Sequence, residues 1–208
     1  MANSTFSGPV RSKGGFTSIS ETATTGAITT LSSISSTGIS SFDANTLATE
    51  AGTGITGGTG TIYRSSVQRV GGIITTRILI DLTGLRSTAS GDIIGVDGTS
   101  NVCHIGQITA ARNGTILTGS MECFEAPAGG DPDINVHSAT EGTGVEDGAI
   151  SSLTETLLVN AGDATLGSKV YFSAVPAADE FLYLTLGDTT DADYTAGKLF
   201  IELMGYEA

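Results

Sequence analysis

The sequence predicts an all-β fold, an antiparallel β-sandwich or jelly roll with an extended N-terminal arm. The composition favours strands and turns over helices, because Thr, Ile, Val and Gly are abundant and strong helix formers are scarce. Short apolar runs recur between Gly, Asp, Asn and Pro residues, which is typical of the strands of a sandwich. Strands do not alternate with long helical segments, and this argues against a parallel α/β fold.

The expected strands follow residue 60, and several show the period-two alternation of a half-buried sheet. Ile78, Ile80 and Leu82 share one face of their run, and Leu79 lies on the other. The last run alternates in the same way, with Leu, Ile and Leu on one face. The expected strands are 61–70, 73–82, 92–96, 102–110, 114–125, 152–160, 168–175, 180–187 and 198–206.

The segments between these runs carry turn signals. Asn-Gly in RNG (112–114) favours the positive φ angles of a tight hairpin turn, and Asp-Gly in VDGTSN (96–101) is a similar signal. Residues 151–158 fit a short helix and a strand equally well. Residues 126–150 are long, polar and rich in Asp and Glu, so we expect an exposed acidic loop there, since loops of this length are usually functional or mobile.

The first 60 residues predict an arm and linker, and residues 61–208 predict the sandwich body. The opening MANSTFSGPVRSKGGFTSIS has basic Arg11 and Lys13, no acidic residue and too few apolar side chains for a core. No apolar segment follows its charges, so it does not resemble a signal peptide, and we expect synthesis in the cytoplasm. The recurring Ile and Leu further along predict an extended segment lying on another surface.

The net charge of −13 is unevenly distributed along the chain. Residues 1–90 hold six basic and four acidic side chains, whereas residues 91–208 hold three basic and eighteen acidic ones. Two interpretations stay open: a molecule with a near-neutral docking end and an acidic end in water, or acidic turn residues that are simply commoner in the later part. Either way, the acidic half disfavours nucleic acid, and no apolar run approaches the ~20 residues of a membrane span.

Motifs for catalysis or metal binding are weak. GTGITG (52–57) matches a dinucleotide fingerprint but lacks the strand before it and the helix after it. Cys103, His104, Cys123 and His137 lack zinc-site spacing, and we expect buried thiols, with His104 facing solvent or a subunit contact and His137 solvated. A Cys103–Cys123 disulfide stays open. The acidic loops do not match an EF-hand, and turn chemistry explains their aspartates better. No enzyme, cofactor or metal is predicted.

The stretch NSTFSGPVRSKGGF (3–16) resembles the opening of virion structural proteins in tailed phages of marine bacteria, such as cyanophages. The resemblance implies a head decoration or cement protein, which binds the outer surface of the capsid and stabilises it by bridging subunits. It further implies a virion location, the major capsid protein as partner and a homotrimer. In this hypothesis the arm contacts the shell or neighbouring copies through Phe6, Arg11, Lys13 and Phe16.

Two other functions use the same fold. A receptor- or glycan-binding knob, fibre or adhesin module would bind its ligand through exposed loops of the sandwich. A hydrolase on a jelly roll would need a polar catalytic constellation, which the sequence does not display.

Overall fold

The computed structural model describes residues 16–21, 28–34 and 46–207, and the chain divides into two units, Met1–Asn45 and Thr46–Ala208. In the first unit, β1 (Phe16–Glu21) pairs antiparallel with β2 (Ile28–Ile34). Part of the expected arm is therefore a pair of strands. Thr, Ser and Ile, which favour extended backbone, make up most of both strands.

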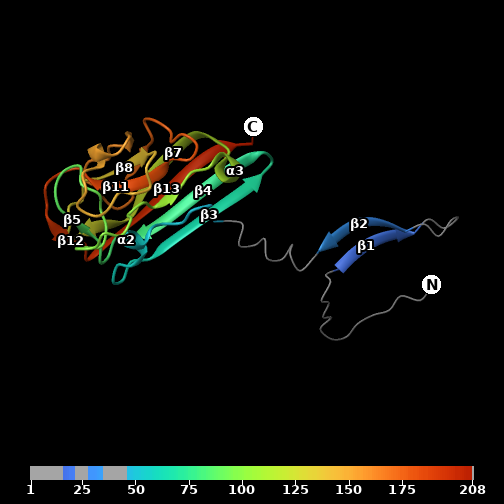
Figure 1. Cartoon of the computed structure of the whole chain (residues 1–208), viewed down its shortest axis with the longest axis horizontal. Coiled ribbons are helices and arrows are strands. Elements are labelled where there is room, and N and C mark those ends of the chain that lie inside the picture. The colour runs from blue at the N-terminus through green and yellow to red at the C-terminus, as the bar shows by residue number, and fades with distance from the viewer. Residues whose placement is uncertain (1–15, 22–27, 35–45, 208) are drawn as a thin grey trace. The chain divides into compact units, whose positions relative to one another are not determined.

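The second unit is built on two antiparallel sheets (Figure 1). The larger sheet has five strands in the order β10 (Lys169–Tyr171), β7 (Thr115–Ala128), β13 (Ala196–Tyr206), β4 (Ile73–Asp81) and β3 (Tyr63–Val70). The smaller sheet has the order β6 (Gly106–Gln107), β11 (Phe181–Leu186), β8 (Ile134–Ala139) and β9 (Glu155–Val159).

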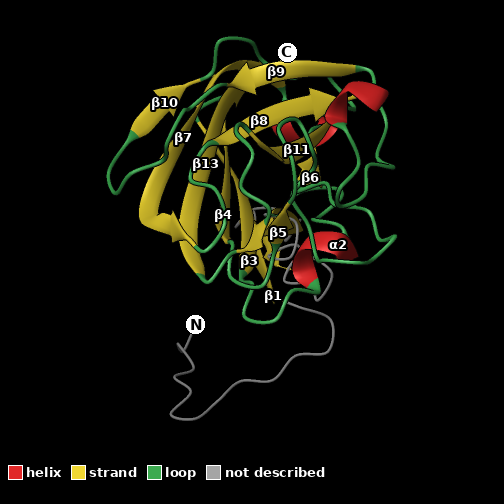
Figure 2. Ribbon diagram, turned by 90° about the vertical axis from the view of Figure 1, so that its left-hand side faces the viewer, coloured by secondary structure: helices red, strands yellow, loops and turns green. Residues whose placement is uncertain are grey.

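Short elements complete the unit. β5 (Arg86–Ser87) pairs with β12 (Ala192–Asp193), and three single-turn helices lie in the connections: α2 (Thr53–Thr56), α3 (Ala110–Asn113) and the 3-10 helix Ile150–Ser152. None of the described helices is long and apolar enough to span a membrane. The predicted all-β antiparallel sandwich is confirmed (Figure 2).

The core lies between the two sheets and follows the alternation of the strands. Ile78 and Ile80 of β4 and Leu199, Ile201 and Leu203 of β13 are fully buried. Because these strands pair without interruption, their apolar faces form one continuous surface against the smaller sheet. The shared face predicted for 78–82 is confirmed, since Leu82 is also buried and Leu79 is not.

The prediction of an exposed acidic loop over residues 126–150 is wrong. β7 continues to Ala128, and β8 is an inner strand of the smaller sheet, between β11 and β9. Residues 140–153 then lie over that sheet, where Gly144 and Ile150 are buried and Tyr183 from β11 hydrogen bonds to the segment. Residues 140–153 therefore cover apolar surface of the smaller sheet, although their composition is polar.

The compact unit begins at Thr46, so the boundary predicted at residue 60 lies too late. Leu47 and Ile55 are buried in the core of the sandwich. The N–H groups of Gly52 and Gly54 donate to the carbonyls of His104 and Val102, each at 2.9 Å. The Gly/Thr-rich stretch is therefore a fixed part of the body, and its glycines allow this close backbone contact.

One of the two predicted turns is present: Asp97 and Gly98 form a turn, with a positive φ of 65° at Gly98. RNG does not close a hairpin, because Arg112 and Asn113 belong to α3, which links β6 and β7 in different sheets. The two-residue hairpin lies at Gly71 and Gly72, between β3 and β4, where both φ angles are positive (59° and 82°). The strand expected at 92–96 is reduced to three isolated bridges, which join Asp92 to Ala149, Ile93 to Thr185 of β11 and Gly95 to Arg86.

Candidate binding surfaces

The two histidines are buried, which contradicts the expectation of solvated side chains. The ring of His104 lies 4.9 Å from that of Phe181 and 6.4 Å from that of Tyr183, under the cover formed by 140–153. His137 lies on β8, and its Nδ1 is 2.8 Å from Oε2 of Glu155. His104 is therefore held by packing against aromatic rings, and His137 by its contact with the Glu155 carboxylate.

Both cysteines are free buried thiols, so the disulfide left open by the sequence is absent. Burial raises the pKa of Cys103 to about 12, and burial also raises the pKa of Cys123. A thiol with such a pKa stays protonated near neutral pH and is a poor nucleophile. Cys103 Sγ donates to the Asn101 carbonyl at 3.3 Å. The thiol is therefore partnered by backbone and does not form a nucleophile–base pair with His104.

The aspartates considered as calcium ligands have local partners. Asp131 accepts the N–H groups of Asp133 at 2.9 Å and Thr190 at 3.1 Å, which is turn chemistry. Asp191 and Asp193 bind Arg86, at 2.8 and 3.2 Å. Within the described part of the chain, no group of three or more His, Cys, Asp or Glu side chains is arranged to hold a metal ion.

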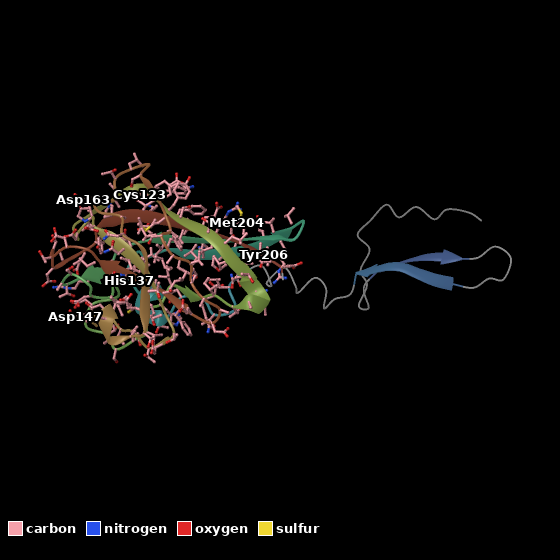
Figure 3. All side chains as sticks on the ribbon, turned by 90° about the horizontal axis from the view of Figure 1, so that it is seen from above. Cys123, His137, Asp147, Asp163, Met204 and Tyr206 are labelled. Atoms are coloured by element: carbon pink, nitrogen blue, oxygen red, sulfur yellow. The ribbon has the colours of Figure 1, made fainter. Side chains whose placement is uncertain are left out.

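These aspartates belong to one end of the sandwich, which we call the acidic end. Its members come from turns far apart in the sequence, and Figure 3 shows Asp147 and Asp163 together on that side, away from Tyr206. Arg86 pairs with three of them, including Asp97 at 3.9 Å. The acidic end consists of Asp92, Asp97, Asp131, Asp133, Glu146, Asp147, Asp163, Asp188, Asp191 and Asp193.

Mutual repulsion at the acidic end is visible in three carboxyl groups. Burial, and after it the neighbouring carboxylates, raise the pKa values of Asp92, Asp133 and Glu146 above their ordinary range. One Oδ of Asp133 is buried without a hydrogen-bond partner. The cluster therefore costs folding energy, as expected where like charges are gathered together.

The opposite end of the sandwich exposes large apolar side chains, and we call it the apolar end. It contains the β3–β4 hairpin, α3, the start of β7 and the chain's last strand residues, which Figure 1 places on the side of the C-terminus. Val70 is 77% exposed and Leu117 is 55% exposed. The apolar end consists of Val70, Ile73, Leu117, Val175 and Tyr206.

Two hollows with volumes of about 390 and 330 Å³ lie at this end, and of the five exposed side chains only Val175 lines one of them. Ala110, Gly114 and Thr115 line both of them, so they adjoin at the turn from α3 into β7. The first is also lined by Arg69 and Glu207, and the second by Val175 and apolar residues nearby. The apolar end is therefore uneven enough to receive side chains of a partner.

Local hydrogen bonds hold this end in shape. Asn113 is fully buried, where its Oδ1 accepts the Thr109 N–H at 2.9 Å and its Nδ2 donates to Thr76 Oγ1 at 2.7 Å. Gly114 has φ of 69°, and a side chain there would meet the Tyr206 carbonyl. These contacts join α3 to the larger sheet, so the hollows are bounded by fixed backbone.

Arg69 ties the chain end to the same region. Its Nη1 lies 2.6 Å from Oε1 of Glu207, and its Nη2 donates to the carbonyls of Ala111 and Arg112. A cation at the last carbonyls of a helical turn is favourable. The charge of Arg69 is thus used internally, which leaves this end dominated by apolar groups.

The sequence did not identify the apolar end. Its exposed side chains come from segments about 30 to 60 residues apart, and no sequence pattern marks them as exposed. The residues predicted for the arm lie elsewhere. Phe6, Arg11 and Lys13 lie outside the described residues, and Phe16 begins β1 without a described side chain.

Comparisons with protein-family models, with curated proteins and with solved structures find no match to this chain.

Proposed function

We propose that the protein is a structural virion protein, a decoration or cement protein that binds the outer surface of a phage head. One observation carries the proposal: the sandwich has an apolar end and, opposite to it, an acidic end. A surface protein of a particle needs one side that docks and another that faces water and repels other particles. The separation of apolar and acidic groups supplies both.

The apolar end supports docking on protein. Val70, Ile73 and Tyr206 are cross-strand neighbours, and exposed apolar rows beside hollows are typical of protein interfaces. Val70 and Leu117 are largely exposed and do not belong to the buried core of the sandwich. The expected partner is the major capsid protein, and a homotrimer would bridge several of its subunits.

The resemblance of residues 3–16 to phage virion proteins supports the same function. Cys103 is a buried, protonated thiol and His104 and His137 are enclosed, so these residues do not supply an exposed Cys–His pair in the described sandwich. A hydrolase is therefore a weaker hypothesis than a structural protein. A glycan-binding module stays a formal alternative that the following experiment addresses.

The test is binding of the purified full chain to phage heads that lack it, followed by sedimentation. Val70→Glu and Leu117→Glu place charge on the apolar end, and we expect each to weaken binding at least about tenfold. Leu166→Glu is the matched control, because Leu166 is 73% exposed outside that end. Equal binding by all three variants would contradict docking through the apolar end.

A deletion tests the arm separately. Removing residues 1–20 takes away Phe6, Arg11, Lys13 and Phe16 together, and we expect weaker attachment to the heads. Attachment that survives this deletion unchanged would show that the arm is not a capsid contact. Binding of the intact chain to host glycans but not to heads would favour the alternative function.

A further inference from the structure

The outer face of the larger sheet differs from the rest of the surface in its charge. Its cations and anions alternate and pair across neighbouring strands. Arg77 Nε lies 2.8 Å from Oε2 of Glu202, and Lys169 Nζ lies 3.4 Å from Oε2 of Glu122. Lys198, toward one end of the sheet, pairs with Asp81 and Glu125. This face is close to electrically balanced in a chain whose net charge is −13.

The same face exposes aromatic side chains among the ion pairs. Tyr171 on β10 is 70% exposed, and Phe124 on β7 is 47% exposed and stacks on Phe200 with ring centroids 5.1 Å apart. Beside Tyr171 lies a hollow of about 230 Å³, also lined by Ser120, Glu202 and Met204. Exposed rings beside a hollow are the usual anchors and pockets of a protein interface.

These strands form a broad, regular surface. Figure 2 shows β10, β7, β13, β4 and β3 side by side along one side of the sandwich. The register of β3, β4 and β13 is continuous, so their outward side chains form straight rows. Such a face can pack flat against a second sheet, as the two sheets of a sandwich do.

We propose that the outer face of the larger sheet binds the same face of a second copy of this chain. The occupant follows from charge. Two copies of a strongly acidic protein repel each other, and the acidic end makes this repulsion strongest. The balanced face removes that penalty, and its rows of alternating sign are complementary to a rotated copy of themselves. Val70, Ile73 and Tyr206 form the last outward row of the same sheet, so this face adjoins the apolar end. The contact pairs two copies and is therefore separate from the homotrimer contact of the proposed function.

The test is the mass of the full chain in solution, by light scattering and sedimentation over a range of concentrations. We expect the wild-type protein to associate, and Tyr171→Glu and Phe124→Glu to raise the dissociation constant at least about tenfold. Leu157→Glu, which adds the same charge on β9 of the smaller sheet, where Leu157 is 37% exposed, keeps the wild-type mass. Salt screens both the overall repulsion between copies and the attraction between the alternating charges, so all variants are compared at one fixed salt concentration.

Several results would overturn the proposal. A wild-type chain that is a monomer at every concentration contradicts it, and so does an oligomer that Tyr171→Glu and Phe124→Glu leave intact. If Val70→Glu abolishes association and Tyr171→Glu does not, the contact between copies lies at the apolar end and the proposal is contradicted. Thermal melting of each variant is the control for folding, because a variant with a normal melting transition still has a folded sandwich. Binding to heads is read separately, so failure here leaves the capsid proposal standing or failing by its own test.

Discussion

Replacing Tyr183 by Phe tests whether residues 140–153 are fixed over the smaller sheet. Tyr183 is fully buried, and its hydroxyl donates to the Glu141 carbonyl at 2.7 Å and accepts the Gly144 N–H at 3.2 Å. Burial raises the pKa of this hydroxyl to about 12, so it remains a donor at neutral pH. The variant keeps the ring and removes both hydrogen bonds.

The expected loss follows from the groups left behind. A buried donor or acceptor without a partner costs about 1–3 kcal/mol, and Gly144 is buried. The Glu141 carbonyl is only partly buried and can find water, so it adds less. We expect a loss of about 2 kcal/mol in the free energy of unfolding, with little from packing, since the ring is unchanged.

Urea denaturation measures this change as a lower midpoint at an unchanged slope. Hydrogen exchange gives a local readout, because the Cys103 N–H donates to the Gly144 carbonyl at 2.8 Å and should lose protection. Tyr171→Phe is the control, because that side chain is largely exposed and its hydroxyl should contribute less than about 0.5 kcal/mol. If Tyr183→Phe unfolds like the control, the segment is not pinned and the cover argument fails.

Two further predictions concern buried groups. Burial lowers the pKa of His104, so the unfolded chain binds more protons than the folded one below about pH 6.5. The stability of the wild type relative to His104→Leu should therefore fall as the pH drops from about 7.5 to 5.5. Urea titrations that show a constant difference between the two proteins would refute this. Cys103 and Cys123 should react with a thiol reagent only after denaturation, and rapid labelling of the native chain would contradict their burial.

Strands with an alternating pattern were predictable from the sequence. The runs 73–82 and 198–206 correspond closely to β4 and β13, because their apolar residues occupy every second position. These strands have one face in the core and one in water, so the pattern shows directly in the sequence. The free thiols were also predictable from the scarcity of cysteine and the apolar runs that contain it.

β8 could not be recognised because it is buried on both faces. Val136 faces the core, whereas His137 lies on the other face with its ring nitrogen held by Glu155. Ser138 is fully buried as well. A strand that buries polar groups through specific partners lacks alternation, and its Gly-, Asp- and Glu-rich flanks indicate a loop. The partner of His137, Glu155, lies 18 residues further along the chain, so no local pattern reports the contact.

The distribution of charge shows the same limit. Counted along the chain, the acidic residues gather after residue 90, and two interpretations stood side by side: a molecule with two ends, or acidic turns. In an antiparallel sandwich each strand reverses the chain, so turns collect at two opposite ends. The turns around Asp92, Asp147 and Asp188 meet at one end, while Gly71–Gly72 and Gly114 meet at the other. The two interpretations are therefore one: acidic turns gathered at a single end make the sandwich two-ended.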